Sequence, residues 1–233
     1  MNLLTILYHI LLDFFFPKFC IFCGSYGKYL CLKCINSKFE FVWSNICPVC
    51  GKESFKAMVH KECSDRTYLD GLVFVVLYNK HVEKLMYVIK HSGFYSVLDE
   101  VISIMVGILK IKKIDSSFVL VSISTTRQKK RTRGFNQSEI IATRLAEKLG
   151  LNYQNILVKV KKTKSQFGLN REARHQNLKN SFVINCDNLP ENIVLIDDVY
   201  TTGSTLNECA KVLKAKGAKK VIGFVFARSG INW

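Results

Sequence analysis

The chain has 233 residues, of which 48% are hydrophobic, and its formal net charge at pH 7 is +16. This length allows one large core and one small additional module, and the hydrophobic content excludes an intrinsically disordered chain. The excess of positive charge favours an anionic partner, such as a nucleic acid, a phosphorylated small molecule or a membrane surface.

The N-terminal segment is strongly apolar from Leu3 to Phe16. It is too short to span a bilayer, and it contains His9 and Asp13. It also lacks the basic region and the small-residue cleavage site of a signal peptide. We therefore expect no transmembrane segment here, but a helix that ends near Pro17 and packs its apolar face on the next domain. Attachment to a membrane surface is the alternative.

Seven of the nine cysteines lie between Cys20 and Cys63, in the pairs CIFC, CLKC and CPVC and in the sequence HKEC. Paired C-x-x-C sequences in a chain without a secretory signal are typical of zinc sites, because each turn directs two thiolates at one tetrahedral ion. All-protein ligation predicts a structural role for one or two Zn²⁺ ions. The eight candidate ligands are Cys20, Cys23, Cys31, Cys34, Cys47, Cys50, His60 and Cys63.

The pairing of these ligands stays open at the level of sequence. Sequential pairing is the simplest, with the first four cysteines on one ion and the remaining four side chains on the other. Interleaved pairing and a single occupied site are alternatives, and a solvated His60 is as compatible with the pattern as a metal ligand. Cys186 and Cys209 stand apart and are expected to be buried thiols. We expect a zinc module over residues 1–66 and a second domain over 67–233.

Strands and helices are predicted to alternate in the second domain. Helical periodicity covers 81–91, 96–110, 136–149 and 204–216, and the alternation indicates a parallel α/β sheet flanked by helices. A polar stretch of about 20 residues ending at Asn180 is expected to be a functional loop or lid. Apolar runs predict strands at 70–79, 117–124, 155–160, 192–197 and 220–227.

The sequence VLIDDVYTTGST, residues 194–205, contains the strongest candidate site. The uncharged run is typical of a central parallel strand, so Asp197 and Asp198 are expected at its carboxyl end, where open α/β sheets bind ligands. The small residues that follow lead into the helix 204–216, whose N-terminus suits a phosphate. Neither a P-loop nor a G-x-G-x-x-G sequence is present. Two acids beside a phosphate site predict a ribose 5-phosphate ligand.

This segment resembles the phosphoribosyl pyrophosphate (PRPP) binding motif of type I phosphoribosyltransferases. The resemblance implies that Asp197 and Asp198 hold the ribose hydroxyls, as the catalytic acids, and that the residues after them hold the 5-phosphate. Mg²⁺ is implied as the ion that accompanies PRPP. The PRPP-binding residues would then be Asp197, Asp198, Val199, Tyr200, Thr201, Thr202, Gly203, Ser204 and Thr205.

The strand 117–124 is followed by a basic loop, STTRQKKRTRGFNQSE. In type I phosphoribosyltransferases the loop after this strand meets the pyrophosphate, whose charge arginine can compensate with paired hydrogen bonds. A solvated basic surface is the alternative. The residues from this loop that we expect at pyrophosphate or nucleic acid are Thr125, Thr126, Arg127, Lys129, Lys130, Arg131 and Arg133.

The zinc knuckles, the sequence RGFNQ at 133–137 and the C-terminal PRPP motif together resemble the ComF family of competence proteins. The resemblance extends to the segment around Lys90 and to SQFGLNREARHQNLKNSFVI at 165–184. It adds Lys90, Gln166, Arg171 and Arg174 to the expected pyrophosphate or nucleic-acid residues. The chain departs from the family pattern at Ser122 and Ser124, where prolines are usual, and at His60, where cysteine is common.

This resemblance implies a PRPP-binding, phosphoribosyltransferase-like protein that handles incoming single-stranded DNA in natural transformation. One alternative is a phosphoribosyltransferase of nucleotide metabolism or salvage, with an acceptor that the sequence does not identify. Another is a zinc-module adaptor that docks a competence helicase or another protein of the uptake machinery. The expected location is the cytoplasm, including the inner face of the membrane. The candidates for stacking on DNA bases are Phe135, Phe167 and Tyr200.

Overall fold

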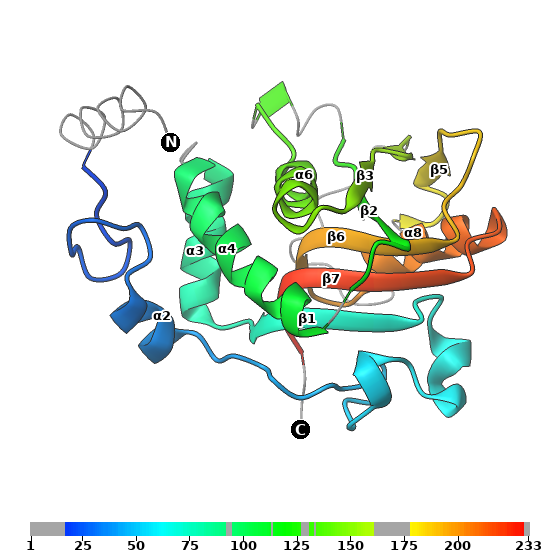
Figure 1. Ribbon diagram of the computed structural model, residues 1–233, viewed down its shortest axis with the longest axis horizontal. Helices are drawn as coiled ribbons and strands as arrows, with labels where there is room; N and C mark the ends of the chain where they lie inside the picture. Colours follow the sequence, from blue (N-terminus) through cyan, green and yellow to red (C-terminus); the bar gives the residue numbers. More distant parts are fainter. Residues whose placement is uncertain are drawn as a thin grey trace.

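The computed structural model describes residues 17–91, 95–112, 114–126, 131–132, 134–160 and 178–230. Its centre is a five-stranded sheet in which every neighbouring pair of strands runs parallel (Figure 1). The α/β fold class predicted from the sequence is therefore confirmed. The strand order is β1-β7-β6-β2-β3, and the bounds are β1 (Gly71–Leu77), β2 (Phe118–Ser122), β3 (Asn152–Gln154), β6 (Asn192–Tyr200) and β7 (Lys220–Arg228).

Helices cover both faces of this sheet. The helices α3 (Lys80–His91), α4 (Tyr95–Lys112) and α6 (Gln137–Leu149) pack on one face, and α8 (Ser204–Ala215) packs on the other (Figure 1). Neighbouring residues of each central strand alternate between the two cores, so that Ile196 lies in the first and Leu195 in the second. Burial on both faces explains the continuous apolar runs that predicted these strands.

The candidate zinc region, residues 17–66, lies against the same sheet. It contains α2 (Leu32–Lys38) and two short 3₁₀ helices, η1 (Phe55–Ala57) and η2 (Lys61–Arg66). The carboxylate of Glu100 in α4 accepts hydrogen bonds from the backbone N–H groups of Tyr29 (2.9 Å) and Leu30 (2.5 Å), just before Cys31. Leu30 and Phe39 join the core under α3 and α4, whereas Ile46 and Leu69 join the core under α8. The domain boundary at residue 66 stays a prediction.

Two short strands form a separate antiparallel pair, β4 (Leu157–Lys159) with β5 (Phe182–Ile184). The predicted strand at 155–160 therefore belongs to this hairpin and not to the main sheet. The chain enters the main sheet earlier, through β3, which pairs with Val119–Val121 of β2. In the hairpin Leu157 is buried and Val158 is exposed, as expected for strands with only one covered face.

The N-terminal segment 1–16, on which the expectation of a packed apolar helix falls, lies outside the described residues, as does most of the polar stretch, 161–177. Among the helices that the structure describes, none has the length and apolar character needed to cross a membrane.

Candidate functional site

The site lies where the central strands β2 and β6 part. Their pairing ends at Ser122 and Ile196, whereas β6 continues beside β7 as far as Tyr200. The helix that follows β2 covers one face of the sheet and the helix that follows β6 covers the other. The chain therefore leaves neighbouring strands in opposite directions, and this creates a crevice at their carboxyl ends. A pocket of about 330 Å³ occupies this position.

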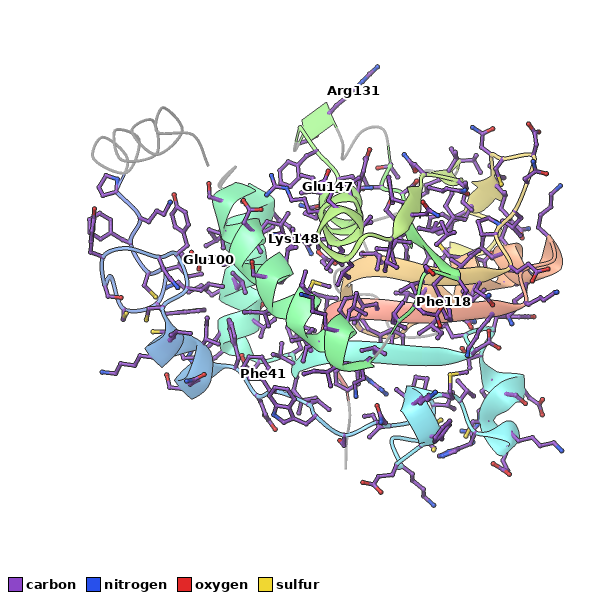
Figure 2. The ribbon with its side chains drawn as sticks, viewed as in Figure 1. Phe41, Glu100, Phe118, Arg131, Glu147 and Lys148 are labelled. Atoms are coloured by element: carbon purple, nitrogen blue, oxygen red, sulfur yellow. The ribbon has the colours of Figure 1, made fainter. Side chains whose placement is uncertain are left out.

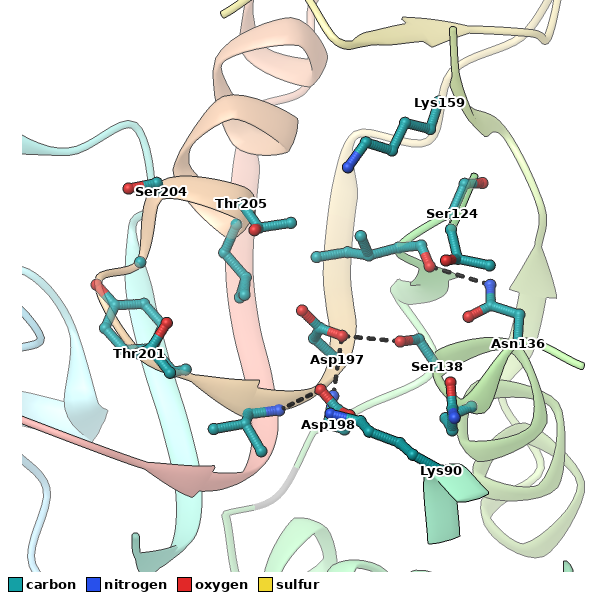
Figure 3. A pocket seen from close by; sticks show the side chains of 17 residues that line it. Lys90, Ser124, Asn136, Ser138, Lys159, Asp197, Asp198, Thr201, Ser204 and Thr205 are labelled. Carbon is teal, nitrogen blue, oxygen red and sulfur yellow. Dashed lines mark hydrogen bonds and ion pairs between the residues drawn. The ribbon is translucent and has the colours of Figure 1, made fainter. Parts of the chain in front are cut away.

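Asp197 and Asp198 are the first residues of β6 beyond the end of β2, and both line the pocket. The Asp197 Oδ1 atom accepts hydrogen bonds from Ser138 Oγ (2.8 Å) and from the Asp198 backbone N–H (3.0 Å). Lys90 Nζ, in the last turn of α3, lies 2.6 Å from Asp198 Oδ2. Figure 3 shows the second oxygen of Asp197 directed away from Ser138, which leaves it available to a ligand hydroxyl.

The two carboxylates differ in electrostatic environment. Burial and, to a smaller extent, the adjacent charge of Asp198 raise the pKa of Asp197 to about 7, against the lowering effect of the Ser138 hydrogen bond. Asp198 instead forms the ion pair with Lys90. Near neutral pH the pair therefore has one titrating carboxyl beside one that is compensated by a lysine.

The loop 201–205, here named the α8 loop, forms another wall of the pocket. Gly203 has a φ of +76°, and an added Cβ would overlap the hydroxyl of Tyr200, so only glycine fits. The first backbone hydrogen bond of α8 joins Asn207 N to Gly203 O (2.9 Å), and the N–H groups before it lie at the positive end of the helix. Thr201, Gly203, Ser204 and Thr205 line the pocket, whereas the hydroxyl of Thr202 lies 2.9 Å from that of Ser204.

Several pocket residues were not among the predicted site residues. Asn136, Gln137 and Ser138 enter at the N-terminus of α6, and Lys159 enters from β4 (Figure 3). The Nε2 atom of Gln137 is buried and has no hydrogen-bond partner in the described part of the chain. Asn136, Gln137 and Ser138 lie at the end of the basic loop in the sequence, and this position could have identified them as site residues. Nothing in the sequence marks Lys159, because a single lysine on a short strand is ordinary surface composition.

The predicted loop after β2 contributes to the pocket through Ser124 and Thr125. Thr126 does not line it, and Arg131 is exposed and points away from the molecule (Figure 2). The serines that replace the family's usual prolines have partners, since Ser122 Oγ lies 2.9 Å from Tyr153 Oη and Ser124 donates to the Leu157 carbonyl. The other predicted residues lie outside the described part of the chain: Arg127, Lys129, Lys130, Arg133, Gln166, Phe167, Arg171 and Arg174.

The candidate metal ligands gather in two clusters with sequential membership. The first cluster is Cys20, Cys23, Cys31 and Cys34, and the ligand atoms of each cluster lie within 4.8 Å of one another. Four sulfurs placed at about 2.3 Å from a tetrahedral zinc are about 3.8 Å apart, so this spacing fits the ion. Hydrogen bonding with Ser25 lowers the pKa of Cys23 to about 6, which favours the thiolate that binds metal.

The second cluster is Cys47, Cys50, His60 and Cys63. The Nδ1 atom of His60 lies 3.3 Å from Cys50 Sγ, and its Nε2 atom lies 2.8 Å from the Glu53 carbonyl oxygen. Metal-binding histidines commonly donate their second ring N–H in this way, which fixes the tautomer with a free nitrogen toward the metal. The backbone N–H of Lys52 lowers the pKa of Cys50 to about 6. Both donor sets therefore fit structural Zn²⁺.

Comparison with protein families gives two matches. Residues 11–65 match the model of a double zinc ribbon domain, and residues 135–232 match that of a phosphoribosyl transferase domain. The first match contains all eight candidate metal ligands, from Cys20 to Cys63. The second contains the acids, the α8 loop and α6.

Curated competence proteins from several bacteria are similar to the chain. Competence protein F of Haemophilus influenzae is 40% identical over 42% of this chain and 44% of that protein, so this match spans less than half of either. Competence protein ComFC of Streptococcus pneumoniae is 30% identical over 85% of this chain and 87% of that protein. Competence protein ComFC of Bacillus subtilis is 29% identical over 86% and 84%.

Proposed function

The chain belongs to the ComF family of competence proteins, and from this premise we propose that its pocket binds PRPP with Mg²⁺. We also propose that the protein acts in DNA uptake. The proposal is carried by the presence in one pocket of the acid pair and the N-terminus of α8. Asp197 and Asp198 would accept hydrogen bonds from the ribose hydroxyls. The N–H groups and hydroxyls of the α8 loop would bind the 5-phosphate.

The remaining wall of the pocket suits the pyrophosphate group. Ser124 and Thr125 follow β2, at the position where type I phosphoribosyltransferases meet pyrophosphate. Bound Mg²⁺ supplies charge compensation to the phosphate oxygens, and the two acids are the carboxylates available to it. Lys159 and Lys90 contribute positive charge to the same pocket.

A second candidate function is transfer of the ribose phosphate to an acceptor. Gln137 favours it, because this residue lines the pocket and its buried Nε2 donor has no partner in the described part of the chain, which suits it to an oxygen or ring nitrogen of a second molecule. Such a reaction breaks the C1–O bond to pyrophosphate and forms a bond from C1 to the acceptor. It requires positioning and charge stabilisation, with no nucleophile from the protein.

The DNA role rests on the net charge of +16 and on the family's part in competence. We place the protein in the cytoplasm, where it would meet incoming single-stranded DNA. Of the proposed stacking residues, Phe135 is buried and Tyr200 packs against Gly203, so both are better explained as packing residues. Docking of a competence helicase through the zinc region is compatible with this role.

Calorimetric titration of the purified protein with PRPP and Mg²⁺ tests the site. We expect micromolar binding by the wild type and a loss of at least about tenfold in Gly203→Ala, because the new methyl group displaces Tyr200 and strains the loop. The matched control is Gly150→Ala, which imposes the same strain at φ +66° with no atom within 4 Å. Equal affinities of the two variants for PRPP would show that the α8 loop does not bind this ligand.

The basic loop is tested by replacing Lys129, Lys130 and Arg131 with glutamine. If these side chains contact DNA phosphates, binding of single strands should weaken for every sequence. The slope of log K against log salt should also fall, by about 0.7 for each lost contact. Fluorescence anisotropy across a series of salt concentrations measures both quantities.

The control for this experiment removes three positive charges elsewhere. Lys148, Lys216 and Lys219 are exposed, and their replacement by glutamine should change the affinity only through net charge. An unchanged salt slope in the variant of the basic loop would show that this loop faces solvent in the complex.

A further inference from the structure

Arg228, the last residue of β7, is a buried cation with an incomplete set of partners. It is 6% exposed, and its Nε and Nη1 atoms have no hydrogen-bond partner within the described residues. Among these residues no carboxylate forms an ion pair with it. A buried guanidinium without an acidic partner is costly unless another negative group lies nearby.

The second metal cluster supplies such a group. The Nη2 atom of Arg228 donates to the carbonyl oxygen of Pro48 at 2.8 Å, and Pro48 lies between the candidate ligands Cys47 and Cys50. Three thiolates and a neutral histidine around Zn²⁺ carry a net charge of −1. The loaded cluster is therefore a counter-charge for Arg228.

The Arg228 guanidinium also lies over two aromatic rings. Its Cζ atom lies 5.4 Å from the ring centroid of Tyr200 and 5.4 Å from that of Phe74. A buried cation at this distance from two rings is held by cation–π attraction. The hydroxyl of Tyr200 in turn packs against Gly203, at the position where a Cβ would be. The side chains of Arg228 and Tyr200 thus join the second cluster to the glycine of the loop.

We propose that Arg228 is a positioning residue that couples zinc in the second cluster to the shape of the α8 loop. When zinc binds Cys47 and Cys50, the Pro48 carbonyl is fixed and holds Arg228. Arg228 fixes the ring of Tyr200, and the ring fixes Gly203. Loss of zinc frees the Pro48 carbonyl and removes the counter-charge, so the loop loses its support. The inference rests on the proposed function, because it requires a ribose phosphate in the pocket.

Coupling of this kind is reciprocal. A ligand that binds the ordered loop must raise the zinc affinity of the second cluster by the same factor by which zinc raises the affinity for the ligand. Couplings between distinct sites are commonly about 5- to 150-fold, and we expect about fivefold or more here. Ribose 5-phosphate is the probe, because it carries the phosphate and hydroxyls without a leaving group.

The experiment measures the zinc affinity of the full chain by competition with nitrilotriacetate, with and without saturating ribose 5-phosphate. In the wild type, ribose 5-phosphate should tighten binding of the zinc in the second cluster by about fivefold or more. In Arg228→Met this effect should disappear, and in Arg228→Lys, which keeps the charge but not the planar fork, it should be reduced. Lys219→Met is the control, because Lys219 forms an exposed ion pair with Glu191.

Each outcome of this experiment decides the inference. Equal zinc affinity with and without ribose 5-phosphate in the wild type would overturn the coupling, even if neither Arg228 variant folds. Persistence of the effect in Arg228→Met would overturn the role of this residue. Calorimetry of the zinc-loaded wild type separates the two proposals. Binding of ribose 5-phosphate without any coupling refutes only the inference, whereas absence of binding refutes the proposed function and the inference together.

Discussion

Replacement of Asp197 by asparagine should weaken PRPP binding strongly and at the same time stabilise the protein. The Oδ1 atom of Asp197 already accepts from Ser138 and from the Asp198 N–H, and asparagine can keep both contacts. Its amide nitrogen then replaces the oxygen that faces the pocket and cannot accept from a ribose hydroxyl. Loss of this charged acceptor should weaken binding by about 100-fold. Calorimetry with PRPP and Mg²⁺ measures the change.

The stabilisation follows from the raised pKa of Asp197, about 7 in the folded protein against 3.8 for the ordinary carboxyl. Between these values the folded state binds more protons than the unfolded state, so the free energy of unfolding falls as pH rises. The penalty is absent below about pH 4 and complete above about pH 7. Asparagine does not ionise, and the gain should reach on the order of 2 kcal/mol above pH 7.

Thermal unfolding at pH 5 and pH 8 checks this prediction. The Tm of Asp197→Asn should exceed that of the wild type by several degrees at pH 8, with a smaller difference at pH 5. Asp187→Asn makes the same change of charge at an exposed carboxylate. This control should have the Tm of the wild type at both pH values and the same affinity for PRPP. A destabilised Asp197→Asn at pH 8 would show that the carboxylate is ionised without cost in the free protein.

Replacement of Cys47 by serine should cause the largest loss of stability among single changes in the zinc region. Cys47 is fully buried and belongs to the second cluster. A serine hydroxyl is a poor zinc ligand, and the binding energy of a structural zinc is folding energy. We expect a loss of about 3 kcal/mol or more, which corresponds to a fall in Tm of about 10 °C.

The measurement combines metal analysis with thermal unfolding. Wild-type protein should contain two equivalents of zinc, and Cys47→Ser should contain about one. Cys186→Ser is the matched control, because Cys186 is half-buried and lies outside both clusters, and it should keep both ions and the wild-type Tm. Full zinc content and an unchanged Tm in Cys47→Ser would exclude Cys47 as a ligand.

The sequence by itself determined most of the secondary structure and predicted the acids and the loop that line the pocket. The strands β1, β2, β6 and β7 were predictable because strands buried on both faces are continuously apolar, as in Ile193–Ile196. The cysteine pairs and the acid pair with its loop, residues 197–205, were recognisable because residues close together in the chain form each of them. Spacing alone fixes which thiolates a single turn can direct at one ion.

Only the tertiary structure decided the contacts between distant segments. Ser138, Gln137 and Lys159 reach the pocket because β2 stops pairing at Ser122, and α6 and the β4–β5 hairpin then border the opening. The membership of the two clusters, the raised pKa of Asp197 and the contact of Arg228 with Pro48 also depend on burial and on approach in space. These quantities arise from groups far apart in the chain, and no local pattern of residues encodes them.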